Sequence, residues 1–184
     1  MKHILSAIFV SLVVRSTGAS LTPATRSPET CGDPTDARLF YRAYNPTEVD
    51  HFYTTNVNLV NAANSGWPLQ GVAALVFVTQ EEATVPFFRL YSAAATDNFY
   101  TISTTERDAA LQNGYVTVAG DPFTFIYPIQ VCGSVPFYRL YHATKKDNFY
   151  TTSESERLDF IANQGYTDIE IAGYVLPVTS TQCD

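Results

Sequence analysis

One short pattern occurs three times in the amino-acid sequence. It reads Phe-Tyr-Arg-Leu-Tyr at 137–141 and then Asp-Asn-Phe-Tyr-Thr-Thr at 147–152, and related forms begin at residues 40 and 87. Its arginine recurs after 47 and then 50 residues, and its aspartate keeps the same spacing. A repeat of this length indicates a small folding unit, copied within the chain, whose apolar face is buried against its neighbours. A surface feature of one copy is then expected three times, which favours multivalent binding.

Each copy predicts two strands, a helix and a closing strand. In the third copy Phe137, Arg139 and Tyr141 alternate with apolar residues, which is typical of a strand, and a short polar loop leads to a second strand at 148–152. The next residues fit the Ser-x-x-Glu capping box at 153–156, and at 103–106 in the second copy, so that the glutamate is expected to reach back to the serine. The first copy has Asn56 as the cap and Leu59 at the glutamate position, which predicts a weaker helix start. Each helix is expected to end at a glycine that an aromatic residue follows, as in Gly66-Trp67.

These elements predict a β-rich α+β fold with short helices. We expect three ββαβ repeats, at about 38–80, 85–130 and 135–178, to close around a pseudo-threefold axis like a three-bladed propeller, because closure covers the edge strands. A β-trefoil-like fold is the alternative, although trefoil units normally lack a helix, and an open solenoid is a third arrangement.

The ends of the chain indicate export. Residues 1–19 resemble a signal peptide, with Lys2 and His3 before an apolar stretch that is too short to span a membrane. We expect a disordered Ser/Thr/Pro-rich leader at 20–35, a single domain at 36–178 and a C-terminal tail at 179–184. The protein is therefore predicted to be secreted and extracellular. A net charge of −7 with dispersed charges predicts no nucleic-acid or membrane partner.

The chain has three cysteines, so one disulfide and one remaining thiol are expected in an oxidising compartment. Cys31 and Cys132 each stand shortly before the first strand of a copy, and they are our preferred pair. A Cys31–Cys183 bond, which would tie the two termini together, is the close alternative. Since the cysteines and histidines are not clustered, we expect no metal and no cofactor.

The repeated arginines and aspartates are interpreted first as structural pairs that brace each hairpin. The pairs are Arg42 with Asp50, Arg89 with Asp97, and Arg139 with Asp147. The alternative is polar recognition of a sugar or carboxylate ligand, and convergence of three aspartates on a metal is the least favoured possibility.

The second strand of each copy also carries a tyrosine beside a histidine or an asparagine. An exposed tyrosine near an aspartate and an amide could bind a sugar, because it offers a flat apolar face and orienting hydrogen bonds. The opposing interpretation is that these aromatic residues are buried to fill a small core. The candidate ligand-binding residues are Asp50, His51, Tyr53, Asp97, Asn98, Tyr100, Asp147, Asn148 and Tyr150.

The motifs at 135–141, 147–157, 165–166 and 171–177 resemble a secreted repeat family of fungi and bacteria that is known only as a repeat of unknown function. The resemblance covers about residues 38–178. It implies an adhesive or cell-wall-binding module, because such repeats occur alone in small secreted proteins or appended to exported hydrolases. It implies no catalytic residues.

We therefore expect a secreted, non-catalytic, lectin-like protein that binds glycan or cell-wall polysaccharide through several weak sites. An interaction or effector protein that binds a protein partner is the alternative. A small glycan hydrolase, using a carboxylate pair such as Asp168 and Glu170, is a third hypothesis.

Overall fold

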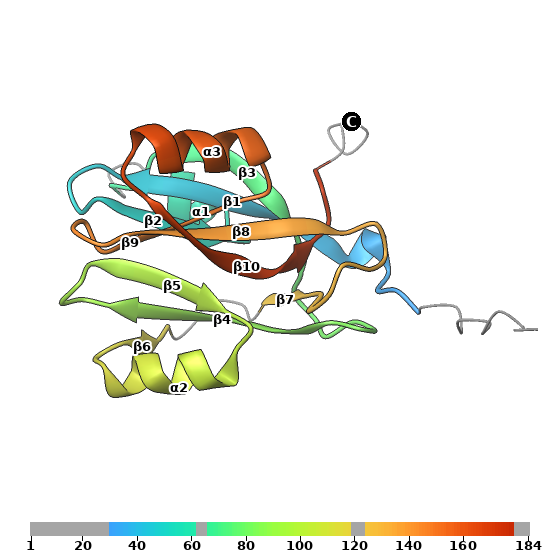
Figure 1. Ribbon diagram of the computed structural model, residues 1–184. Helices are drawn as coiled ribbons and strands as arrows, with labels where there is room; N and C mark the ends of the chain where they lie inside the picture. The colour runs from blue at the N-terminus through green and yellow to red at the C-terminus, as the bar shows by residue number, and fades with distance from the viewer. Residues whose placement is uncertain (1–29, 62–65, 119–123, 179–184) are drawn as a thin grey trace, which may run out of the picture.

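A computed structural model describes residues 30–61, 66–118 and 124–178 (Figure 1). The predicted signal peptide at 1–19, most of the predicted leader and the predicted tail at 179–184 lie outside these residues. The elements are a 3₁₀-helix (Pro34–Asp36), β1 (Ala37–Asn45), β2 (Asp50–Thr54), α1 (Asn58–Asn61), β3 (Leu69–Phe77), β4 (Val85–Ser92), β5 (Asp97–Thr101), α2 (Thr104–Gln112), β6 (Val116–Thr117), β7 (Thr124–Ile126), β8 (Val135–His142), β9 (Asp147–Thr151), α3 (Glu154–Asn163) and β10 (Thr167–Val175). This is the predicted order, except that two short strands, β6 and β7, follow the helix of the second copy.

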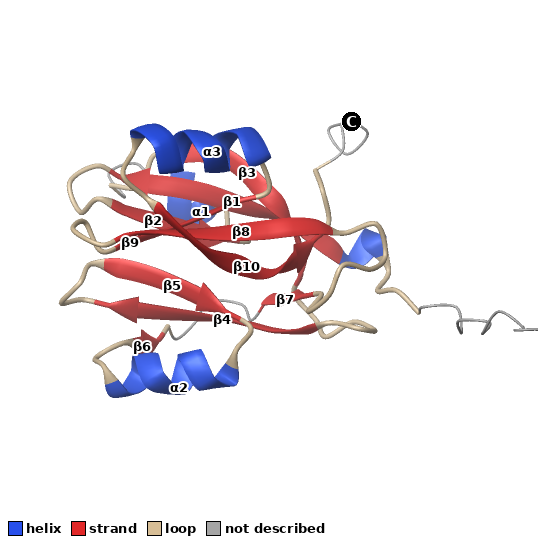
Figure 2. Cartoon of the chain, viewed as in Figure 1, coloured by secondary structure: helices blue, strands red, loops and turns tan. Residues whose placement is uncertain are grey.

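The strands form open antiparallel sheets with short helices outside them (Figure 2). Seven strands make the larger sheet, in the order β2-β1-β3-β7-β4-β5 with β6 paired to β4, and the smaller sheet has the order β10-β8-β9. Isolated bridges join Leu75 to Leu176 and Tyr127 to Tyr174, so the third copy contacts the strands of the other two. Helices α2 and α3 lie at opposite sides of the molecule in this view.

The centre of the core is aromatic. Each copy contributes a phenylalanine from its first strand and a tyrosine from its second strand, and all six residues are at most 2% exposed. The rings pack mainly edge to face, a geometry that favours aromatic contacts beyond their buried area. The six residues are Phe40, Phe87, Phe137, Tyr53, Tyr100 and Tyr150.

The predicted serine caps are confirmed, but the predicted role of the capping glutamates is wrong. Ser103 and Ser153 accept a hydrogen bond from the backbone amides of Glu106 and Glu156, each at 3.2 Å. The Glu106 carboxylate does not reach back to Ser103, because it accepts instead from the Thr101 hydroxyl and from Arg139 of the next copy. In the first copy the Asn56 side chain accepts from the Asn58 amide, as the sequence predicts for a cap at this position.

Cys31 and Cys132 form a disulfide, which confirms the preferred pairing. The bond joins residues 101 positions apart and ties the segment before β1 to the segment before β8. Cys183 lies outside the described residues. None of the helices in the described part of the chain has the length and apolar character needed to cross a membrane.

Candidate functional site

The predicted ligand-binding residues lie in the interior. The three tyrosines and three aspartates of the second strands are 0–2% exposed, and the histidine and asparagines beside them are 1–3% exposed. This corrects the expectation that these side chains face a polysaccharide. The structure brings them together, but around the centre of the molecule rather than on its surface.

The tyrosine hydroxyls join the second strands of the three copies. Tyr53 Oη donates to the Tyr150 carbonyl and accepts from the Tyr150 amide, both at 2.7 Å. Tyr100 binds the backbone of Tyr53 in the same way, and Tyr150 binds the backbone of Tyr100. These six bonds form a closed cycle in which each tyrosine satisfies a buried amide and a buried carbonyl of another copy. We refer to this arrangement as the tyrosine cycle.

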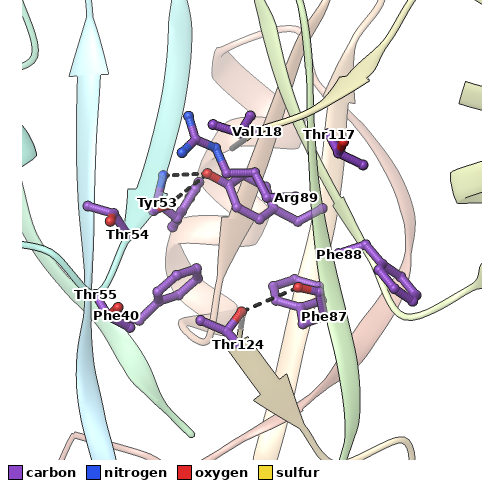
Figure 3. A pocket seen from close by; sticks show the side chains of 11 residues that line it. Phe40, Tyr53, Thr54, Thr55, Phe87, Phe88, Arg89, Thr117, Val118 and Thr124 are labelled. Atoms are coloured by element: carbon purple, nitrogen blue, oxygen red, sulfur yellow. Dashed lines mark hydrogen bonds between the residues drawn. The ribbon is translucent and has the colours of Figure 1, made fainter. Parts of the chain in front are cut away.

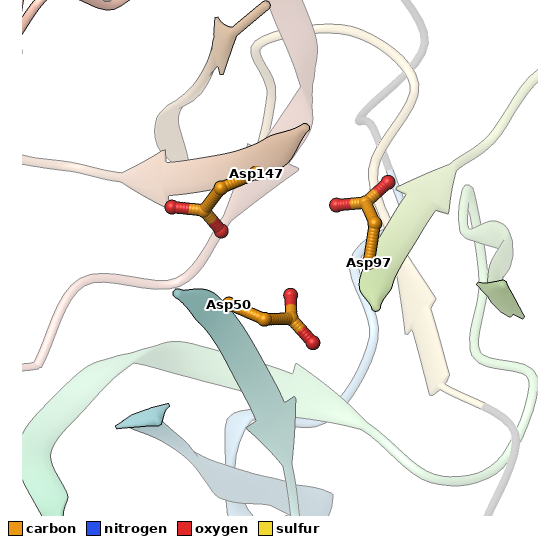
Figure 4. A group of neighbouring side chains, drawn as sticks. All are labelled: Asp50, Asp97 and Asp147. Atoms are coloured by element: carbon orange, nitrogen blue, oxygen red, sulfur yellow. The ribbon is translucent and has the colours of Figure 1, made fainter. Parts of the chain in front are cut away.

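The aspartates form a second cycle at the start of the same strands (Figure 4). Asp50 accepts from the amide and the side-chain nitrogen of Asn98, at 3.1 and 2.6 Å. Asp97 accepts in the same way from Asn148, and Asp147 accepts from His51, whose Nδ1 lies 2.7 Å away. Each carboxylate therefore binds the residue that follows the aspartate of another copy.

A tyrosine hydroxyl adds a further donor in two copies only. Tyr115 Oη donates to Asp97 at 2.6 Å, and Tyr166 Oη donates to Asp147. The first copy has Trp67 at this position, and Trp67 packs against Phe52 with ring centroids 5.4 Å apart. Asp50 accepts both of the bonds described above from Asn98.

The carboxyl groups of Asp50 and Asp97 have unequal pKa values. The pKa of the Asp50 carboxyl is raised to about 8, chiefly by burial and also by the nearby Asp97 and Asp147 charges, and the two bonds from Asn98 offset only part of the shift. Burial raises the pKa of Asp97 to about 6, and the bonds from Tyr115 and Asn148 hold it below that of Asp50. Asp50 is therefore mainly protonated at neutral pH, which reduces repulsion within the cluster.

The three aspartates are close enough together to hold a metal ion. One carboxylate oxygen from each lies within 4.8 Å of the others, a spacing at which oxygen ligands could surround a hard cation. Each carboxylate already accepts two or three hydrogen bonds from protein donors, however, and these donors account for the cluster. We therefore assign the aspartates a structural role.

The backbone is strained where it leads into these aspartates. Val49, Thr96 and Lys146 have φ values of 58°, 53° and 59°, in the left-handed region that side chains rarely adopt. A β-branched residue such as Val49 costs about 1–3 kcal/mol in this conformation. The same turn precedes all three aspartates, so the hydrogen bonds of the buried carboxylates offset this strain.

The predicted arginine–aspartate pairs are wrong. The register of β1 and β2 sets Arg42 opposite Tyr53 and Asp50 opposite Asn45, so Arg42 and Asp50 point to different faces of the hairpin. Arg42 instead makes two hydrogen bonds to Glu156, at 2.8 and 2.9 Å, and Arg139 binds Glu106 and Glu170, each at 3.0 Å. Arg89 binds Asn98.

Each arginine also lies over a phenylalanine of another copy. The guanidinium carbons of Arg89, Arg139 and Arg42 are 4.2, 4.4 and 4.9 Å from the ring centroids of Phe52, Phe99 and Phe149, respectively. Cation–π contacts of this kind contribute about 0.5–2 kcal/mol each. The arginines are thus structural, as predicted, but they connect copies rather than the two strands of a hairpin.

Asp168 and Glu170, the carboxylates of the glycan hydrolase hypothesis, have different arginine partners. Asp168 accepts from Arg157, and Glu170 accepts from Arg139. Each carboxylate is therefore held by a different guanidinium.

Three cavities lie where one copy meets the next. The cavity between the first two copies has a volume of only about 50 Å³ and is walled by core aromatics and threonines beside Arg89 (Figure 3). A second cavity, of about 140 Å³, lies beside the Arg42–Glu156 pair. The third, between the second and third copies, has a volume of about 250 Å³. We call it the Arg139 cavity, and it is lined by Phe99, Ala110, Tyr115, Arg139, Tyr141, Asn148 and Ile169.

A single small residue explains the size of the Arg139 cavity. Ala110 and Phe160 are both the seventh residue after the serine cap of their helices. Phe160 stacks on Phe149 with ring centroids 3.8 Å apart, and thereby fills the space beside that ring. Ala110 leaves the space beside Phe99 open. Among the predicted ligand-binding residues, only Asn148 lines this cavity, and sequence reasoning did not select Ala110, Tyr115, Tyr141 or Ile169.

The comparisons with known proteins identify a family without a known role. A family model described as "Domain of unknown function (DUF5648)" matches residues 37–176. No curated protein and no solved structure gives a significant match.

Proposed function

We propose that this chain, which belongs to the DUF5648 family of unknown function, is a non-catalytic carbohydrate-binding protein that uses the Arg139 cavity as its binding site. The observation that carries the proposal is the combination of aromatic walls and an available donor in one open cavity. Tyr115 and Tyr141 are half-buried there, and Ile169 is 46% exposed at its edge. Such rings offer the apolar surface on which the C–H face of a sugar packs.

Arg139 supplies the polar contact. Its Nε donates to Asn148 and its Nη1 donates to Glu106 and Glu170, whereas Nη2 makes no hydrogen bond with the described residues. The guanidinium is therefore fixed in place, with one nitrogen still able to donate to a ligand hydroxyl. A preorganised donor of this kind favours binding because little side-chain freedom is lost.

The volume of the cavity indicates a small ligand unit. About 250 Å³ is slightly below the range of about 300–1,000 Å³ that is usual for drug-sized ligands, so the site suits a single sugar ring of a longer glycan. We do not propose binding through three equivalent sites. The residues that would have formed those sites are buried.

We also propose that the protein is exported and that its copies close into a propeller-like ring. Export is supported by the signal-like residues 1–19 and by the Cys31–Cys132 disulfide, since disulfides persist in oxidising compartments. Closure around a pseudo-threefold axis is supported by the tyrosine cycle and by the contacts that β2, β5 and β9 make with one another.

Filling the cavity is expected to abolish glycan binding. Ala110→Phe places a ring where Phe160 lies in the third copy, and should therefore leave folding intact. Binding to insoluble glucan, chitin and plant cell-wall fractions should fall at least about tenfold, measured by pull-down and titration calorimetry. Ala109→Phe is the matched control, because Ala109 is an exposed residue of the same helix that does not line the cavity.

A second variant tests the aromatic wall. Tyr141→Ala should weaken binding about tenfold, whereas Tyr91→Ala, at the corresponding strand position of the second copy, should not. Glycan binding that survives both Ala110→Phe and Tyr141→Ala would place the site elsewhere. Failure of the wild-type protein to bind any glycan, together with specific binding to a protein partner, would favour the alternative interaction role.

A further inference from the structure

We propose that the Arg139 cavity accepts uncharged sugar units and discriminates against acidic ones, and that Glu170 sets this preference. The inference rests on the proposed function, because it concerns the ligand of the same site. It assigns the cavity a ligand class, namely neutral hexose or N-acetylhexosamine units rather than uronic acids.

Two carboxylates surround the available donor of Arg139. Arg139 Nη1 lies 3.0 Å from Oε1 of Glu106 and 3.0 Å from Oε1 of Glu170. One guanidinium thus faces two carboxylates, and the group as a whole carries a net charge of about −1 at neutral pH. A sugar carboxylate bound at Nη2 would be a third anion on the same cation, whereas a sugar hydroxyl would accept the hydrogen bond without this repulsion.

The two carboxylates that contact Arg139 are more exposed to solvent than its own side chain. The side chains of Glu106 and Glu170 are 37% and 40% exposed, while that of Arg139 is 13% exposed. A ligand bound to the guanidinium therefore lies close to two partly exposed carboxylates. The net charge of −7 acts in the same direction at longer range, since it repels acidic polymers.

Glu170 distinguishes this arginine from its counterpart in the first copy. Among the carboxylates of the described residues, only that of Glu156 forms an ion pair with Arg42, and the strand residue opposite Arg42 is Gly71. The strand residue opposite Arg139 is Glu170, at the corresponding place in β10. The second carboxylate is therefore an addition of the third copy, and it binds the arginine that lines the largest of these three cavities. It contributes no hydrogen bond to any described residue other than Arg139.

The test compares oligosaccharides of matched length on the full chain. Neutral cello-, laminari- and chito-oligosaccharides are titrated by calorimetry against oligogalacturonate, with wild-type protein and with Glu170→Gln. We expect the wild type to bind the best neutral oligomer at least about tenfold more tightly than oligogalacturonate. Glu170→Gln should strengthen oligogalacturonate binding about tenfold and change neutral binding less than about twofold.

Glu154→Gln is the matched control. Glu154 is an exposed glutamate of α3 that binds Arg157 rather than Arg139, and its replacement changes the net charge by the same amount. An equal gain in oligogalacturonate binding from Glu154→Gln would assign the effect to overall charge and overturn the role of Glu170. Equal binding of acidic and neutral oligomers by the wild type would overturn the inference while leaving the proposed function intact. Absence of binding to both classes would overturn the proposed function itself.

Discussion

Replacement of Tyr100 by phenylalanine is expected to remove about 2–6 kcal/mol from the free energy of unfolding. The lost hydroxyl donates to the Tyr53 carbonyl at 2.8 Å and accepts from the Tyr53 amide at 2.9 Å. Both backbone groups belong to a residue that is 1% exposed, so water cannot replace the hydroxyl. Each unsatisfied buried group costs about 1–3 kcal/mol, which is a large share of the total stability of a domain. Urea unfolding at constant pH, followed by circular dichroism, measures the change.

Tyr91→Phe is the matched control for this measurement. The Tyr91 ring is half-buried, and its hydroxyl makes no hydrogen bond with the described residues. The free energy of unfolding should therefore change by less than about 0.5 kcal/mol. A comparably small change in Tyr100→Phe would show that the tyrosine cycle does not hold the copies together.

The cycle also predicts equal effects at its three members. Tyr53→Phe and Tyr150→Phe each leave one buried amide and one buried carbonyl unsatisfied, in the backbones of Tyr150 and Tyr100. The three substitutions should therefore agree within about 1 kcal/mol. One neutral position among the three would contradict the equivalence of the copies that the proposed ring requires.

The sequence could predict the elements because their signals are local. The alternation around Arg139 marks a strand, Ser153 marks a helix start, and these patterns depend on residues only a few positions apart. Hairpin register, which is also a local signal, could have excluded Asp50 as the partner of Arg42. Counting outward from the loop at 46–49 sets Arg42 opposite Tyr53, and so on the other face from Asp50.

Burial of the aspartates could not be predicted in this way. A polar strand start such as Asp97-Asn98 is typical of a solvent-facing hairpin end, since isolated carboxylates are rarely buried. The donors that permit burial come from another copy: Asn98 is 48 residues from Asp50, and His51 is 96 residues from Asp147. Only the packing of three copies brings these groups together.

The Arg139 cavity could be predicted from the sequence only in part. The difference between Ala110 and Phe160 is visible when the copies are aligned, and it could have drawn attention to the second helix. Whether the space beside Phe99 remains open, however, depends on Tyr141 and Ile169, which come from the third copy. A small residue in an alignment predicts a cavity only when the opposing surface is known.

The stability of the protein is expected to fall as the pH rises, because Asp50 is buried in its protonated form. Its pKa in the folded protein is about 8, compared with about 3.9 for an unfolded chain. Between these values the folded state binds a proton that the unfolded state has released, so the contribution is complete below about pH 4 and is lost by about pH 8. The slope is about −1.4 kcal/mol per pH unit, and Asp97 adds to it below about pH 6. Urea unfolding at pH 5, 6, 7 and 8 measures the slope.

Asp50→Asn should remove this slope between pH 6 and 8. The variant should be less stable than the wild type at pH 5, because an amide nitrogen at this position cannot accept the bond that Asn98 Nδ2 donates to Asp50. It should be more stable at pH 8, where the wild type must ionise Asp50 in the interior or lose stability. The two stability curves are therefore expected to cross. His51, which contacts Asp147 in the same cluster, is unchanged in the variant, so the difference between the curves isolates Asp50.

Asp36→Asn, at an exposed residue of the 3₁₀-helix, should retain the slope of the wild type. Parallel curves for Asp50→Asn and the wild type would mean that Asp50 is ionised in the folded protein, and that the charges of the cluster are balanced in another way.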